Sequence, residues 1–224
     1  MTQTIESAQE YLREAHIDGW LLRDYFDANP IFWNVLGGHA NNVTRPCWLF
    51  IPADGAPTLL AHGVDAGRFT ELWDELGGMI APVTSYSSRA SLIDELTALL
   101  ADSSTIAMEY SPEDALPRVG RTGAGSIELI RNLGVDVVSS GNVLQHATER
   151  WSPEQLESHR YAAVRLTRIV HTTFDFVSEN INWKLTEHDL VVLIVDDYGD
   201  ICVVLCACTQ YGRSANIDAF NRVD

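Results

Sequence analysis

The sequence predicts an α/β fold with a mixed sheet, followed by one long helix. Along residues 1–149, short apolar runs typical of strands alternate with amphipathic segments typical of helices. Two of these runs, 47–51 and 58–61, are joined by a segment that contains glycine and prolines, which predicts an antiparallel hairpin. From Ser152 onward, apolar residues recur with the period of a helix.

The first elements follow from apolar spacing and capping residues. Apolar residues three or four apart predict a helix that Gly19 ends: Ile5, Ala8, Leu12 and Ala15. Residues 20–22 predict a buried strand. Asn29 and Pro30 can cap a short helix over 31–36 that ends at Gly37. The polar loop 39–42 that follows is a candidate functional segment.

The remainder of residues 1–149 continues the alternation. We expect a short helix over 68–76, a strand over 79–83, and a helix that Ser88 caps and that carries leucines up to Leu100. The later elements are a strand over 105–108, a helix over 127–133 that Gly134 ends, a strand over 135–138 and a helix over 141–148.

The long helix begins with a capping box, because Ser152 is followed by Pro153 and, three positions after the serine, by Gln155. One predicted apolar face is formed by Leu156, Ala163, Leu166, Val170, Phe174, Val177 and Ile181. This face needs a partner surface, and the residues after Asp189 are too few to form a second full domain. We therefore expect an α/β domain over 1–149 and the incomplete start of another over 150–224.

Composition excludes several classes of protein. The 224 residues include 15 basic and 31 acidic side chains, a formal charge of −16 that repels nucleic acid. Acidic residues interrupt the apolar residues of the first helix, so neither a signal peptide nor a membrane span is predicted, and we expect a cytoplasmic protein. Cys47, Cys202, Cys206 and Cys208 lack the spacing of a zinc or redox site, which favours structural thiols.

No local catalytic or nucleotide-binding motif is present. The sequence contains no GxGxxG after a strand, no GxxxxGK, no GxSxG and no HExxH. Cys47 with His39 or His62 could form a thiol–base pair, but a buried, inert thiol at a strand start is favoured. Glu187, His188 and Asp189 cannot converge on one ion from consecutive helical positions, and Thr186 with Asp189 is typical of a helix start. The acidic residues 196–200 are interpreted as a turn.

Three segments, taken in order, resemble the creatinase, prolidase and aminopeptidase P family: residues 118–131, 133–138 and 151–156. The resemblance covers residues 5–189 and includes the pair Thr186 and Glu187 near the end of the linker helix. It implies a mixed α/β N-terminal domain that precedes a "pita-bread" metallopeptidase domain. After Asp189 the resemblance fades, and Lys184 stands where the family often has glycine.

The resemblance implies hydrolysis of the bond before a proline, or of creatine in one branch. Two divalent metal ions, such as manganese, cobalt or zinc, perform it, held by two aspartates, a histidine and two glutamates. No position of this chain matches these ligands, so we expect no catalytic residue, no metal ligand and no cofactor here, and no activity of the chain alone. A truncated gene, a frameshift or a degenerate copy would each explain this pattern.

The resemblance also implies one binding residue. In the creatinase branch, the loop before the hairpin supplies an arginine to the substrate of the partner subunit, and Arg45 stands at this position. A guanidinium suits a carboxylate because it offers two parallel donors. His39 in the same loop is a weaker companion. The alternative is that Arg45 forms a structural ion pair at a strand start.

Three functions remain open. The first is the N-terminal portion of a metal-dependent Xaa-Pro peptidase, which would form a homo-oligomer through its N-terminal domain and act on proline-containing peptides in full-length form. The second is a non-catalytic dimerisation or binding module, whose partner would cover the apolar face of the long helix. The third is a small-molecule binding domain that uses the loop 39–45.

Overall fold

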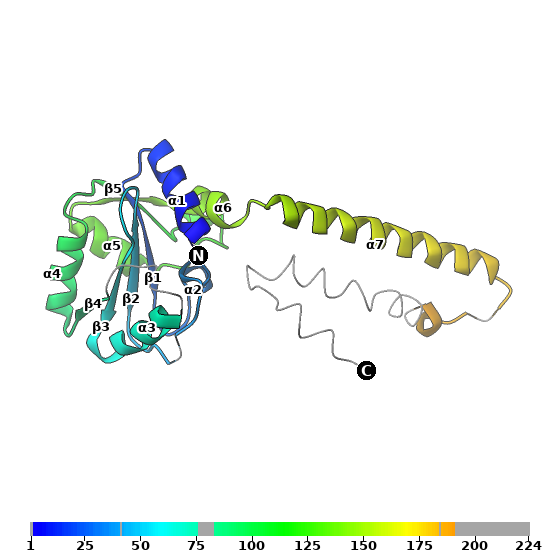
Figure 1. Ribbon diagram of the computed structural model, residues 1–224, viewed down its shortest axis with the longest axis horizontal. Helices are drawn as coiled ribbons and strands as arrows, with labels where there is room; N and C mark the ends of the chain where they lie inside the picture. The colour runs from blue at the N-terminus through cyan, green and yellow to red at the C-terminus, as the bar shows by residue number, and fades with distance from the viewer. Residues whose placement is uncertain (1, 41, 76–82, 184, 191–224) are drawn as a thin grey trace. The chain divides into compact units, whose positions relative to one another are not determined.

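The computed structural model describes residues 2–40, 42–75, 83–183 and 185–190 (Figure 1). Contacts between Cα atoms divide the chain into two units, Met1–Arg150 and Trp151–Asp224. The strands are β1 (Gly19–Asp24), β2 (Cys47–Pro52), β3 (Thr58–His62), β4 (Thr84–Tyr86), β5 (Thr105–Met108) and β6 (Asp136–Ser139). The helices are α1 (Thr2–Glu14), α2 (Pro30–Leu36), α3 (Gly63–Glu75), α4 (Arg89–Leu99), a 3₁₀ turn (Pro112–Asp114), α5 (Ala124–Asn132), α6 (Gly141–Thr148) and α7 (Pro153–Glu179).

The first unit contains a six-stranded sheet in the order β4-β3-β2-β1-β5-β6. The pairs β1–β2 and β2–β3 are antiparallel, and the other three pairs are parallel. The hairpin of β2 and β3 that the sequence predicts is therefore confirmed, as is the mixed sheet. β1 pairs with β2 along its whole length, from Gly19 opposite Pro52 to Asp24 opposite Cys47.

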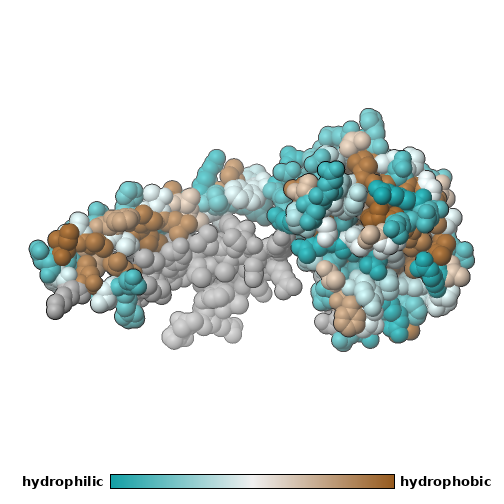
Figure 2. Space-filling model, turned by 180° about the vertical axis from the view of Figure 1, so that it is seen from behind, coloured by the Kyte–Doolittle hydropathy of each residue, from teal (hydrophilic) through white to brown (hydrophobic). Residues whose placement is uncertain are grey.

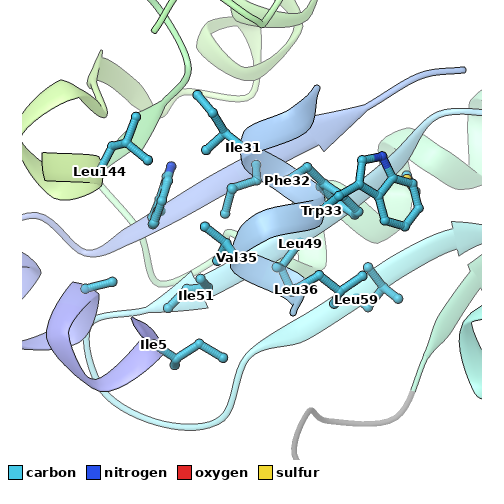
Figure 3. Close-up of a cluster of buried hydrophobic side chains, with 14 of the residues drawn as sticks. Ile5, Ile31, Phe32, Trp33, Val35, Leu36, Leu49, Ile51, Leu59 and Leu144 are labelled. Atoms are coloured by element: carbon cyan, nitrogen blue, oxygen red, sulfur yellow. The ribbon is translucent and has the colours of Figure 1, made fainter. Parts of the chain in front are cut away.

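Side chains from the two faces of the sheet enter two separate hydrophobic clusters, because successive residues of a strand point to opposite faces. Trp20 and Leu22 pack with residues of α1, α2, α3 and α6. Leu21 and Trp48 pack with residues of α4 and α5 on the other face. The first unit thus has three layers, and Figure 3 shows the contribution of α2 to the first cluster.

Capping interactions fix the helix ends that the sequence predicts. The Asn29 side chain accepts the backbone N–H groups of Ile31 and Phe32, and Gly37 ends α2 with a left-handed backbone (φ 78°). Ser88 and Ser152 each form a capping box with the residue three positions later, Ser91 and Gln155. These contacts place the ends of α2, α4 and α7 as expected.

The role predicted for Gly19 is wrong. α1 ends at Glu14, and Gly19 is instead the first residue of β1. The ring of Phe50 crosses directly above it, so a Cβ at this position would lie 2.3 Å from Phe50 Cε2 and 3.1 Å from the carbonyl oxygen of Ile51. Glycine is needed here for close packing and not to end a helix.

Two further predictions differ from the structure. α3 begins at Gly63, several residues before the predicted start at residue 68. The strand described in this region is β4, over Thr84–Tyr86, and Val83 precedes it. Most of the strand predicted over 79–83 lies outside the described residues. So do Lys184, the acidic residues 196–200, and Cys202, Cys206 and Cys208.

The second unit contains α7, which exposes part of the predicted apolar face and buries other apolar residues beside it. Ala162 and Ile169 are buried, whereas Val170 is 53% exposed and Phe174 is 70% exposed. Four exposed apolar residues share one side of the helix and form a row, called the α7 row below: Ala163, Val170, Phe174 and, just beyond the helix, Ile181. Figure 2 shows brown, hydrophobic side chains along α7. The apolar arc of α7 is therefore wider than the predicted stripe, and one of its flanks faces solvent.

None of the helices in the described part of the chain has both the length and the apolar character that crossing a bilayer requires.

Candidate functional site

The carboxyl ends of five strands lie along one edge of the sheet, because β1, β3, β4, β5 and β6 run in the same direction. Open α/β sheets commonly bind ligands at this edge. The buried polar residues of the described chain lie at or just after these strand ends: Asp24, Asn29, Asp65, Glu109 and Ser140. Since burying polar groups is costly unless they are paired, this edge is the candidate functional site.

Glu109 directly follows β5 and is fully buried. Its Oε1 accepts hydrogen bonds from Trp20 Nε1 at 2.6 Å and from Ser140 Oγ at 3.4 Å, and its Oε2 accepts one from Asn29 Nδ2 at 3.2 Å. Burial raises the pKa of Glu109 to about 7, although these donors act in the opposite direction. One carboxyl group thus joins β1, β5, the start of α2 and the start of α6.

Asp24, the last residue of β1, holds the turn that leads to α2. Its two carboxylate oxygens accept the backbone N–H groups of Asn29 at 2.8 Å and of Asp27 at 3.0 Å. Within this turn, Phe26 and Asp27 have positive φ angles of 57° and 62°, a region that non-glycine residues seldom occupy. The hydrogen bonds of Asp24 therefore stabilise a strained turn at the edge of the sheet.

His39 lies beside this turn, in the loop between α2 and β2. Its Nε2 is 2.5 Å from Asp27 Oδ1, and its ring centroid is 4.4 Å from that of Trp33. Trp33 in turn stacks on Phe69 of α3. A carboxylate and an aromatic ring thus orient the imidazole of His39. The His39 side chain remains partly exposed to solvent.

Arg45 precedes β2 and has a different partner, Asp65 in the first turn of α3. Asp65 Oδ2 accepts the backbone N–H groups of Arg45 at 3.1 Å and Thr44 at 3.4 Å, and it lies 3.9 Å from Arg45 Nη1. Arg68 Nε is 3.8 Å from the other oxygen of Asp65. The Asp65 side chain is 2% exposed and that of Arg45 is 42% exposed. Arg45 therefore forms the ion pair of the alternative interpretation while its guanidinium still faces solvent.

The sequence did not identify Asp27, Asp65 or Glu109 as site residues. A weak signal was present for two of them, because Glu109 directly follows an apolar strand and Asp65 follows the strand 58–62 within three residues. Their partners are distant in sequence: Trp20 is 89 positions from Glu109, and Arg45 is 20 positions from Asp65. Sequence spacing could not bring these residues together.

Neither a metal centre nor a reactive thiol is found in the described part of the chain. Its His, Cys, Asp and Glu residues form no group of three that could hold a metal ion, so these donors do not fit a dinuclear centre. Cys47 is buried at the start of β2, and burial raises the pKa of its thiol well above the ordinary value. This environment favours the inert thiol.

Comparison with known proteins identifies the fold. A dipeptidase PepE from Mycobacterium ulcerans matches with a TM-score of 0.53 and 17% identity, over 88% of this chain and 49% of that chain. The prolidase from Pyrococcus horikoshii matches with a TM-score of 0.47 and 13% identity, over 88% of this chain and 48% of that chain. A creatinase/prolidase N-terminal domain of an X-Pro dipeptidase from Streptococcus pyogenes matches with a TM-score of 0.44 and 18% identity. This match covers 61% of this chain and 98% of that domain. The chain shares the fold of the PepE dipeptidase.

The predicted fold class is thereby confirmed. The chain spans about half the length of the prolidase and the PepE dipeptidase that it resembles. No family model matches the sequence, and no curated protein matches it significantly. At 17% identity, the likeness to the PepE dipeptidase establishes the fold alone.

Proposed function

We propose that this chain is the N-terminal portion of a metal-dependent Xaa-Pro peptidase of the aminopeptidase P and prolidase type. The observation that supports this function is the fold shared with a dipeptidase over 88% of the chain. In this proposal, residues 1–149 form the N-terminal domain and residues 150–224 begin the catalytic domain. The chain alone is inactive, because the two aspartates, the histidine and the two glutamates of the metal site have no counterparts in its sequence.

Arg45 is the proposed contact of this portion with the substrate. Its guanidinium can offer paired N–H donors to the carboxylate of a proline-containing peptide. Asp65 binds the backbone of Arg45 and lies near its guanidinium, which limits the freedom of the side chain before a ligand arrives. His39 lies in the same loop and is a secondary candidate for contact with the peptide.

Two assays test this function. The full chain, supplied with manganese or cobalt, should release no proline from glycyl-proline, and sustained release would contradict the inactive state. In NMR titrations, glycyl-proline should shift the Arg45 signals, whereas glycyl-prolinamide, which lacks the carboxylate, should not. Arg45→Gln should abolish the shift, and Arg89→Gln, on the surface of α4, should preserve it. Equal shifts with both ligands would exclude carboxylate recognition by Arg45.

The exposed α7 row supports a second candidate, a non-catalytic dimerisation module. Phe174 and Ile181 are 70% and 73% exposed, and such apolar rows commonly mark interfaces. Light scattering should then show a dimer that Phe174→Ser dissociates. Val164→Ser is the matched control, because Val164 is equally exposed but lies on another side of α7. A monomer at all concentrations would exclude this candidate.

A further inference from the structure

Arg23, in β1, carries a positive charge for which the described residues provide no acceptor. Its Cζ lies 5.7 Å from the ring centroid of Tyr25 and 5.5 Å from that of Trp48. Its Nε is buried without a hydrogen-bond partner, and no described residue forms a salt bridge with it. Arginines in such surroundings are normally paired, because an unpaired buried donor costs about 1–3 kcal/mol.

Trp48 is the cross-strand neighbour of Arg23 and carries a second unsatisfied donor. It is opposite Arg23 in the pairing of β1 with β2 and is almost completely buried. No described residue accepts a hydrogen bond from its Nε1. Two adjacent side chains therefore provide N–H donors and no acceptor, in a chain that has 31 acidic and only 15 basic residues.

The neighbouring carboxylate does not complete this arrangement. Asp24 follows Arg23 in β1, so its side chain points to the opposite face of the sheet. Both Asp24 oxygens already accept backbone N–H groups, from Asn29 and Asp27. Burial lowers the pKa of Arg23, and the negative charge of Asp24 only partly opposes this effect. A contacting anion would stabilise the guanidinium.

The geometry selects the kind of anion. The rings of Tyr25 and Trp48 lie near the guanidinium, where they provide cation–π attraction. Because Nε is buried, a ligand would bind at the edge formed by the terminal N–H groups. A carboxylate matches such an edge with two parallel hydrogen bonds. The formal charge of −16 disfavours a doubly charged phosphate more strongly than a singly charged carboxylate. Tyr25 is half exposed and can contact the carbon chain of the ligand.

We propose that Arg23, framed by Tyr25 and Trp48, binds the carboxylate group of a small acid or of an acidic peptide. This site does not depend on the function proposed for Arg45.

NMR titration of the full, ¹⁵N-labelled chain tests the proposal. The probes are sodium propionate, the peptide acetyl-Ala-Glu-Ala-amide, sodium phosphate and, at matched ionic strength, sodium chloride. We expect saturable shifts of the Arg23 Nε–H and Trp48 Nε1–H signals with both carboxylates and none with chloride. Tighter binding of the peptide would identify an acidic peptide as the ligand, and equal or tighter binding of propionate would identify a small acid.

Variants separate this site from non-specific charge effects. Arg23→Lys keeps the charge but loses the paired donors, so it should weaken binding by about tenfold or more. Arg131→Gln is the matched control, because Arg131 also lies over an aromatic ring, that of Tyr110, yet donates to the carbonyl oxygen of Val137. The absence of saturable shifts, a preference for phosphate, or an equal loss in both variants would overturn the proposal.

Discussion

The buried carboxyl group of Glu109 should make the stability of the first unit depend on pH. Its pKa is about 7 in the fold, against an ordinary value of 4.5, because burial disfavours the charged form. A raised pKa means that the folded chain holds the proton more tightly than the unfolded chain does. The stabilisation is therefore complete below about pH 4.5, decreases as the pH rises, and is lost above about pH 7.

The size of the effect follows from the two pKa values. Their difference corresponds to about 3 kcal/mol in the free energy of unfolding, of which about 2–3 kcal/mol should appear between about pH 5 and pH 8. Glu109→Gln removes the titration but keeps the shape. Its amide N–H₂ would face the donor group of Asn29, so the variant should also lose one hydrogen bond, about 1 kcal/mol at every pH.

Urea denaturation at several pH values, followed by tryptophan fluorescence, measures this difference. The free energy of unfolding of the wild type should fall relative to that of Glu109→Gln by about 2–3 kcal/mol from about pH 5 to pH 8. Glu128→Gln, at an exposed position of α5, should run parallel to the wild type. A constant difference between the wild type and Glu109→Gln would refute the reasoning, because Glu109 would then titrate as a free side chain does.

Two further predictions concern packing and capping. Gly19→Ala should destabilise the protein by about 1–3 kcal/mol, because the new Cβ would overlap the Phe50 ring. Gly67→Ala, in α3, should stabilise the protein by up to about 1 kcal/mol, because no atom lies near the new Cβ. The melting temperatures of the two variants test this difference. Ser152→Ala should remove the capping box of α7, at a cost of about 1 kcal/mol, and speed amide hydrogen exchange in the first turn of the helix. Ser158→Ala, on the exposed surface of the same helix, should not change this exchange. Equal exchange in both variants would contradict this role of Ser152.

Local signals in the sequence predicted most of the fold. The bounds of β5 and α6 are those expected. Asn29, Ser88 and Ser152 cap helices as predicted. These successes share one cause: the groups that decide each structure lie within about four residues of one another.

The sequence-based predictions fail where contacts between residues distant in sequence determine the structure. Gly19 looked like a helix end, but the ring of Phe50 on the neighbouring strand determines its role. On α7, periodicity predicted the apolar row that contains Val170 but did not identify Ile169, which is buried beside it.

The candidate site was predicted less completely than the fold. Arg45 and His39 lie at the carboxyl edge of the sheet, and their binding role stays a prediction. The residues that orient them, Asp65 and Asp27, were missed because each lies on a separate element that meets the loop only after folding. A charged residue after an apolar run shows where an edge lies, but it does not show which side chain it will meet.

The position of β1 in the sheet has a consequence for synthesis on the ribosome. β2, β3 and β4 emerge soon after β1 and complete one half of the sheet, but β5, its other neighbour, emerges only later. Until then, the central strand of the finished domain is an edge strand, with unpaired backbone groups and the apolar Leu21 and Trp20 beside them. Nascent chains that have not yet released β5 therefore carry an open strand edge of the kind that pairs with other chains.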